Sequence, residues 1–236
     1  MLERHIVGVI VPPADGEVPP ELTQLYGAEL DFVATGLALG RLTPDGYDAV
    51  IDKVAAAARF LAGQGAAAVA LMGTSLSFYR GQAFNRELVR TMAEATGLPV
   101  TTMSNAIVEA LRSVGATRLA VATAYTAEVN DRLTMFLQDC GFEVMALEAL
   151  DLVEIHDVHA VGDADLLALG RRAAARARGA DGLLISCGGL RTLPVELPLE
   201  QALGVPVVSS AVAGAWAAAR LAGHSGRVKG LTRLLT

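Results

Sequence analysis

Two short segments combine side chains that could do chemistry with glycines that expose the backbone. Residues 186–190 read Ser-Cys-Gly-Gly-Leu and place the Cys187 thiol beside two glycines, whose N–H groups could bind an anion. Residues 72–77 read Met-Gly-Thr-Ser-Leu-Ser, and the hydroxyls of Thr74 and Ser75 could hold a carboxylate or an enolate oxygen. We therefore expect an acid or a nucleophile in one segment and an oxyanion-binding loop in the other. The alternatives are a buried structural cysteine and turn-forming hydroxyls.

The elements that must position these segments alternate along the chain. Short apolar runs bounded by Gly and Pro, typical of buried parallel strands, alternate with amphipathic stretches of helical length. Thr43 as N-cap, followed by Pro44 at the first helical position, predicts the start of a helix that ends near Gly63 or Gly65. Residues 73–81 are expected to form a loop. The other elements predicted in this part of the chain are strands at 6–11, 66–72 and 99–102 and helices at 84–95 and 105–114.

The second half of the chain repeats the first. Ile6 and Arg118 both lie near the start of an apolar run and are 112 residues apart. Gly73 and Cys187 both follow directly on an apolar run and are 114 residues apart. Offsets close to half the chain length predict an internal duplication, with strands at 117–122, 183–186 and near 205–207 and a last helix at 210–221.

The predicted fold class is α/β, with two pseudo-symmetric halves. Each half is expected to hold a parallel four-stranded sheet flanked by helices, with the active site in the cleft between the halves. The first half is predicted to cover residues 1–103 and to be joined by the C-terminal helix, 210–236. The second is predicted to cover 104–209. A single non-repeating sheet is the alternative.

Composition narrows the function classes. The 236 residues are 53% hydrophobic but only 5% aromatic and carry a net charge of -6, which excludes a disordered chain and disfavours nucleic acid as a ligand. Cys140 and Cys187 lie far apart, so we expect reduced thiols and a cytoplasmic protein. Residues 60–79 carry no charge, but their glycines and hydroxyls argue against a membrane span. We expect a small-molecule ligand and a monomer.

No cofactor or metal is predicted from the motifs. The chain lacks a phosphate-binding glycine loop with lysine, a dinucleotide fingerprint and a Gly-x-Ser-x-Gly elbow. His156 and His159 are spaced for one face of a helix, but no third ligand cluster accompanies them. A solvated helix start or a pocket rim is the interpretation we favour for these histidines.

Four segments of the sequence resemble the arylmalonate decarboxylases, a family of the aspartate/glutamate racemase superfamily. The resemblance covers nearly the whole chain, and the segments that carry it are Val11 to Pro13, Gly36 to Tyr47, Leu71 to Gly81 and Ser186 to Leu190. Members of the superfamily place one residue from each half on either side of the substrate α-carbon, and in the racemases both are cysteines. Here the first position is Gly73 and only Cys187 remains.

The resemblance implies a mechanism and a set of site residues. One carboxylate of a disubstituted malonate would leave as CO₂ from an apolar pocket, and an oxyanion hole would hold the resulting enediolate. The implied donors are Thr74, Ser75, the Tyr125 hydroxyl and the backbone N–H groups of Ser75, Cys187 and Gly188. Cys187 would then protonate one face, giving one enantiomer. The implied substrate contacts are Pro12, Pro13, Leu39, Leu42, Tyr47, Ile155 and Val158.

Two rival functions stay open at this point. A racemase or a maleate-type cis-trans isomerase of the same superfamily would use the same cleft, although Gly73 leaves it one thiol short. A non-catalytic protein that binds small carboxylates would need only the donors.

Overall fold

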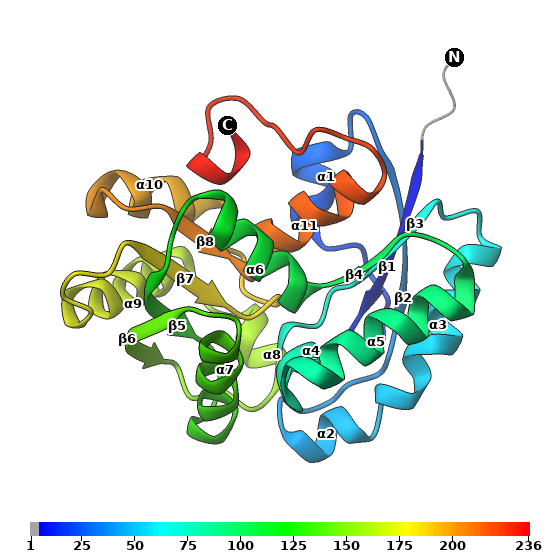
Figure 1. The fold of residues 1–236 in the computed structure, drawn as a ribbon, viewed down its shortest axis with the longest axis horizontal. Coiled ribbons are helices and arrows are strands. Elements are labelled where there is room, and N and C mark those ends of the chain that lie inside the picture. The colour runs from blue at the N-terminus through cyan, green and yellow to red at the C-terminus, as the bar shows by residue number, and fades with distance from the viewer. Residues whose placement is uncertain (1–4) are drawn as a thin grey trace.

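Two parallel sheets of four strands each form the framework of the molecule. They are seen in a computed structural model of the chain, which describes residues 5–236. In the first sheet the order is β2-β1-β3-β4 and in the second it is β6-β5-β7-β8. Figure 1 shows the first sheet on the right and the second on the left. The strands are β1 (Ile6–Val11), β2 (Asp31–Gly36), β3 (Ala68–Leu71), β4 (Val100–Thr102), β5 (Arg118–Thr123), β6 (Glu143–Ala149), β7 (Gly182–Ser186) and β8 (Val207–Ser209).

The two sheets share one topology, which confirms the predicted α/β fold of two pseudo-symmetric halves. Adding four to every strand number of the first sheet gives the order of the second, and every strand pair is parallel. β3 and β7 are buried along their whole length, because helices cover both faces of a parallel sheet. The edge strands β2 and β6 are only partly buried, so they lack the continuous apolar run that marks the inner strands.

Helices flank both sheets, and α11 contacts two strands of each sheet. The helix α11 packs against α1 and α6 and touches β3 and β4 of one sheet and β7 and β8 of the other. Its residues 210–219 are all buried and mostly small, so both sheets can approach it closely. The division of the chain at residue 103 stays a prediction. The helices that flank the sheets are α1 (Pro20–Tyr26), α2 (Pro44–Asp48), α3 (Val54–Gly63), α5 (Gly81–Thr96), α6 (Met103–Ser113), α7 (Ala127–Asp139), α9 (Asp163–Arg176), α10 (Leu193–Leu203) and α11 (Ser210–Leu221), with 3₁₀ turns η1 (Ile51–Lys53) and η2 (Arg233–Leu235).

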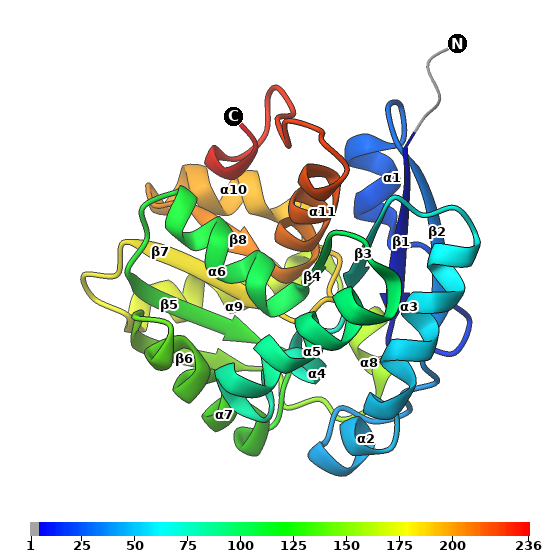
Figure 2. The same ribbon diagram turned by 45° about the vertical axis from the view of Figure 1, so that its right-hand side comes forward.

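Two short helices lie between the sheets. Figures 1 and 2, seen from directions 45° apart, both place α4 (Thr74–Phe78) and α8 (Ile155–His159) in this central position. The prediction of a loop over 73–81 is therefore wrong. The Ser77 hydroxyl donates to the carbonyl of Gly73 and lies 2.6 Å from the Ser104 hydroxyl of α6, and these contacts hold the segment helical despite its turn-forming residues.

The helix predicted from Thr43 to Gly63 is also divided. Its start is as expected, because the Thr43 side chain accepts a hydrogen bond from the N–H of Gly46 and Pro44 occupies the first turn. The chain then leaves helical geometry at Val50, where φ is -121°. The result is α2, η1 and α3 in place of one helix.

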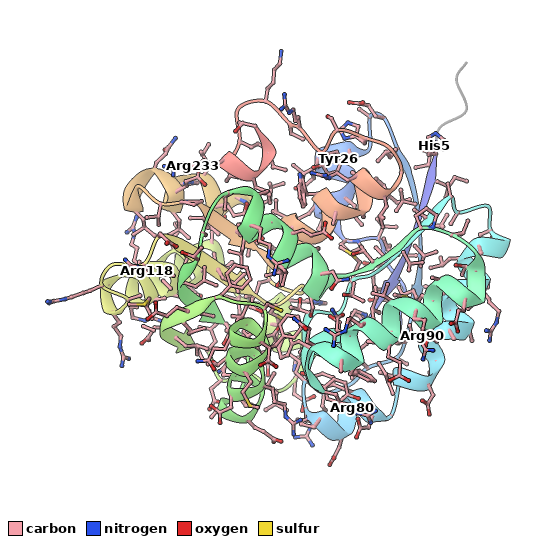
Figure 3. All side chains as sticks on the ribbon, viewed as in Figure 1. His5, Tyr26, Arg80, Arg90, Arg118 and Arg233 are labelled. Carbon is pink, nitrogen blue, oxygen red and sulfur yellow. The ribbon has the colours of Figure 1, made fainter. Side chains whose placement is uncertain are left out.

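Most charged side chains lie on the surface, although Glu21, Glu196 and Glu200 are buried. Arg80, Arg90 and Arg118, labelled in Figure 3, are exposed around the outside of the molecule. The uncharged stretch 60–79 divides into the end of α3, the strand β3 and α4. Among residues 5–236 the helices are all too short or too polar to cross a bilayer.

Candidate active site

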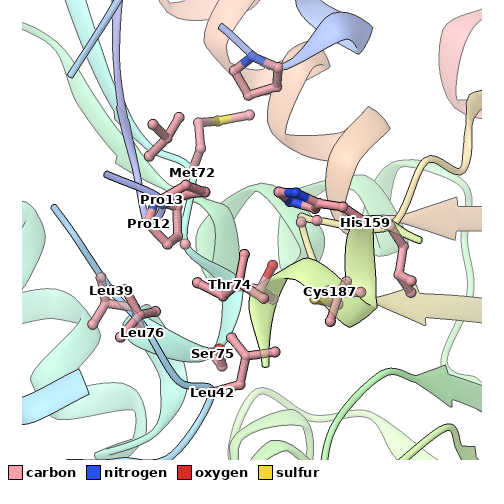
Figure 4. Close-up of a pocket in the computed structure, with 18 of the residues that line it drawn as sticks. Pro12, Pro13, Leu39, Leu42, Met72, Thr74, Ser75, Leu76, His159 and Cys187 are labelled. Atoms are coloured by element: carbon pink, nitrogen blue, oxygen red, sulfur yellow. The ribbon is translucent and has the colours of Figure 1, made fainter. Parts of the chain in front are cut away.

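One pocket lies where the carboxyl ends of the two sheets face each other. It encloses about 970 Å³, its open mouth included, and residues from both halves line it (Figure 4). Loops at the carboxyl ends of parallel strands are where α/β folds bind ligands, and here two such sets of loops meet. The pocket brings together all but one of the predicted site residues: Pro12, Pro13, Leu39, Leu42, Gly73, Thr74, Ser75, Tyr125, Ile155, Val158, Cys187 and Gly188.

Cys187 follows directly on β7 and lies at the pocket wall. Only 5% of the residue is exposed, and burial raises the pKa of its thiol to about 11, although the backbone of Gly189 and Leu190 partly opposes the shift. The thiol is therefore protonated at neutral pH and can give up a proton. The Cys187 N–H donates to the Ser210 hydroxyl at 3.1 Å, so it is engaged within the protein. The expectation that this N–H serves the oxyanion hole therefore stays a prediction, and a ligand oxygen would have to replace or share the Ser210 hydroxyl.

The first turn of α4 presents a group of donors to the same pocket. Thr74 and Ser75 are both buried there. The N–H groups that begin a helix have no partner within it, so those at the start of α4 are free for a ligand. The Thr74 hydroxyl donates to the sulfur of Met103 at 2.8 Å, a weak acceptor that a carboxylate oxygen would replace. This arrangement can bind a carboxylate on one wall.

Tyr125 adds a donor from the second half. Its side chain is fully buried, and its hydroxyl has no hydrogen-bond partner in residues 5–236. Burial raises the pKa of Tyr125 well above its usual value, so the hydroxyl keeps its proton. Its backbone carbonyl accepts from the Asn130 side chain at 3.0 Å, which fixes the segment after β5. A buried donor without a partner, at a pocket wall, is suited to an oxygen of a ligand.

The Gly188 N–H completes the donor set. It makes no hydrogen bond within the described part of the chain. A side chain at this position would clash, because a Cβ atom on Gly188 would lie 2.7 Å from the Met103 sulfur. A larger residue would therefore force either the Met103 side chain or this loop to shift.

The apolar end of the pocket is closed by two loops, one from each half. Leu39 and Leu42 come from the loop after β2, and Ile155 and Val158 belong to α8. The Leu42 N–H donates to the carbonyl of Val153 at 2.8 Å, which joins the two loops. The Arg41 and Glu154 side chains pair beside this bond at 3.2 Å.

Tyr47 is the predicted site residue that does not line the pocket. It is fully buried, its ring packs edge-on against Tyr79 at 5.0 Å, and its hydroxyl has no hydrogen-bond partner among residues 5–236. Burial raises its pKa, and Ser75 and Cys187 are among the groups that influence the shift, so the hydroxyl lies close behind the pocket wall.

The two histidines of α8 differ in position. His156 is exposed and its ring lies 3.2 Å from Asp157. His159 lines the pocket, and Figure 4 shows its ring directed into it. The pocket also contains residues that the sequence analysis did not single out, in the loops after β1 and β7. Their position after strands at the carboxyl edge was the available signal. They are Asp15, Glu17, Val18 and Pro19, with Pro20 and Glu21 at the start of α1 and Arg191 after β7; Met72, Leu76 and Leu190 also line the pocket and belong to the two segments named from the sequence.

Comparison with known proteins agrees with the geometry. The family model described as arylmalonate decarboxylase matches residues 7–235. Arylmalonate decarboxylase of Bordetella bronchiseptica is 50% identical over 223 residues, 94% of this chain and 92% of that protein. A liganded crystal structure of a doubly substituted arylmalonate decarboxylase is 49% identical, covers 98% of both chains and superposes with a TM-score of 0.95.

A second set of relatives shares the fold at lower identity. The maleate cis-trans isomerase of Nocardia farcinica superposes with a TM-score of 0.89 at 24% identity, over 98% of this chain and 97% of that one. The resemblance read from the sequence segments is confirmed by the first set of relatives and by the extent of the family match. The chain belongs to the arylmalonate decarboxylase family.

Proposed function

We propose that this protein, a decarboxylase by family, converts disubstituted α-aryl or α-alkenyl malonates into single enantiomers of the corresponding acids, without a cofactor. One carboxylate of the substrate binds the donors of Thr74, Ser75, Tyr125 and the Gly188 N–H. The other lies against the apolar end formed by Leu39, Leu42 and Ile155, where a carboxylate finds few donors, so the ground state is disfavoured there.

Cleavage follows from this arrangement. The bond between the α-carbon and the apolar carboxylate breaks, CO₂ leaves, and the electron pair moves into the remaining carboxylate to give an enediolate. Negative charge grows on the two oxygens that the fixed donors contact, so these donors stabilise the transition state more than the substrate. The Cys187 thiol then gives its proton to the α-carbon, and solvent returns a proton to the thiolate.

The observation that carries this proposal is a single protonated thiol facing a group of oxygen-binding donors. With its pKa raised to about 11, the Cys187 thiol suits an acid rather than a base at neutral pH. Gly73 stands at the corresponding position of the first half, so proton delivery comes from one side of the pocket. Racemisation by two thiols has no second thiol to use.

The test is incubation of the purified protein with 2-methyl-2-phenylmalonate in chelator-treated buffer. We expect loss of the diacid and formation of one enantiomer of 2-phenylpropionate, measured by chiral chromatography. Cys187→Ala should lose most of the rate, whereas Cys140→Ala, which removes the other thiol, should retain it. Equal turnover by Cys187→Ala and the wild type would contradict the proposal. Binding without turnover by both would favour a carboxylate-binding protein.

A further inference from the structure

The pocket has a second end whose chemistry differs from the apolar one. Here the loop after β1 supplies Asp15 and Glu17, the first turn of α1 supplies Glu21, and the loop after β7 supplies Arg191. Arg191 is exposed and makes no direct hydrogen bond or ion pair with any residue between 5 and 236, although its charge acts on the buried Glu21. An arginine that lines a ligand pocket without a partner is available to a ligand, and its planar guanidinium matches a carboxylate.

His159 lies beside this cation and over the loop that carries Cys187. A Cβ atom on Gly189 would lie 3.3 Å from the Nε2 and Cδ2 atoms of His159, so the imidazole packs on that glycine. Figure 4 shows the ring reaching into the pocket between the prolines Pro12 and Pro13 and the Cys187 side. Burial and the nearby Arg191 lower the pKa of His159, with Asp15 opposing them, so the neutral ring offers a hydrogen bond rather than a charge at pH 7.

The acidic residues at this end differ in how far they can compensate the positive charge of Arg191. Asp15 and Glu17 are exposed to solvent, where charge pairs are weak. Glu21 is buried, and burial raises its pKa despite the attraction of Arg191, which favours its neutral form. Arg191 is therefore the one pocket cation that none of the described acids holds in an ion pair.

The proposed reaction determines which part of a substrate would reach the end of the pocket that contains Arg191. One carboxylate is held by the donors of α4 and the other lies at the apolar end, so the larger α-substituent extends past Pro12, Pro13 and Gly189. We propose that this pocket takes arylmalonates whose ring carries a distal carboxylate, and that Arg191, assisted by His159, binds that carboxylate. This inference rests on the proposed decarboxylation and adds the chemical class of the α-substituent.

The experiment compares two substrates across three proteins. The substrates are 2-methyl-2-phenylmalonate and 2-methyl-2-(4-carboxyphenyl)malonate, and the proteins are the wild type, Arg191→Leu and Arg59→Leu. Arg59 is exposed on α3, so its removal controls for net charge. The measured quantity is kcat/KM for the carboxyphenyl substrate divided by kcat/KM for the phenyl substrate. We expect Arg191→Leu to lower this ratio about tenfold, chiefly by raising KM for the carboxyphenyl substrate. Arg59→Leu should keep the wild-type ratio, and Arg191→Lys should recover part of it.

Several outcomes would overturn the inference. An equal effect of Arg191→Leu on both substrates would show that Arg191 serves only the fold. Preference for a 4-(aminomethyl)phenyl substrate would show that the acidic residues decide specificity. Failure of the proposed decarboxylation can be distinguished from failure of this inference, because in the first case the wild type does not turn over the phenyl substrate either. In that case calorimetry measures the affinities of the two malonates for Cys187→Ala, with and without Arg191→Leu, and the ratio of these affinities takes the place of the kcat/KM ratio.

Discussion

Gly188→Ala tests whether the donors of the pocket act as a rigid group. The new Cβ atom would lie 2.7 Å from the Met103 sulfur, 3.0 Å from its Cε and 3.3 Å from the carbonyl oxygen of Met72. Ordinary contact needs about 3.5–4.0 Å. Met103 has little freedom to move away, because its sulfur accepts the Thr74 hydroxyl and a Cβ atom on Gly214 would be only 2.8 Å from its Cε.

The loop itself must therefore shift, by roughly 0.5–1 Å, if the overlap is to be relieved. A displacement of about 1 Å at a reacting group costs on the order of a hundredfold in rate, and loss of one oxyanion donor costs about 10²–10³ in kcat. We expect kcat for the arylmalonate to fall about a hundredfold. Overpacking should lower the free energy of unfolding by about 1–3 kcal/mol, which appears as a decrease in Tm.

The assay pairs steady-state decarboxylation with thermal unfolding followed by circular dichroism. Gly63→Ala is the matched control, because nothing lies within 4 Å of a Cβ atom there and its backbone is helical. It should leave kcat unchanged. Met103→Ala in the Gly188→Ala background should recover part of the rate by opening space. A Gly188→Ala protein with wild-type kcat would refute the argument that this backbone N–H is positioned for the reaction.

Two further predictions concern buried ionisable groups. Alkylation of Cys187 by iodoacetamide in a Cys140→Ser background should still rise tenfold per pH unit at pH 9.5, because the thiol pKa is raised to about 11; a plateau near pH 7 would identify a thiolate base instead. Glu196 is fully buried and burial raises its pKa to about 8, so the folded protein holds this proton to higher pH than the unfolded chain. The free energy of unfolding should fall, on the order of a few kcal/mol, as pH rises from about 4.5 to 8. Glu196→Gln should flatten this slope in urea titrations, and an unchanged slope would contradict the assignment.

The inner strands and the position of Cys187 could be predicted because both depend on patterns of neighbouring residues in the sequence. Fully buried parallel strands need continuous apolar runs, and the runs before Gly73 and Cys187 are of this kind. Because the second half of the sequence repeats the first, an apolar run in one half strengthened the prediction of a strand at the matching position of the other. The edge strands β2 and β6 were not located, because one side of each meets solvent and their pattern resembles that of an ordinary surface segment.

The fine geometry of the site depends on contacts between residues distant in sequence. The segment from Gly73 to Phe78 has the composition of a turn, and its helical form relies on the contact of Ser77 with Ser104, 27 residues away. Likewise the Cys187 N–H is taken by Ser210. No local pattern predicts such partners, which explains why the sequence did not show that Ser210 contacts the Cys187 N–H.

The central claim is that one thiol, fixed on one side of the pocket, decides which enantiomer forms. The Gly73→Cys, Cys187→Ser double variant tests it by moving the acid to the pseudo-symmetric position. A Cβ atom on Gly73 would meet Leu76 at 3.1 Å and Pro12 at 3.4 Å, so small adjustments admit the side chain. Chiral chromatography of the 2-phenylpropionate formed from 2-methyl-2-phenylmalonate should show the opposite enantiomer to that of the wild type. The same enantiomer as the wild type, at comparable optical purity, would contradict the account.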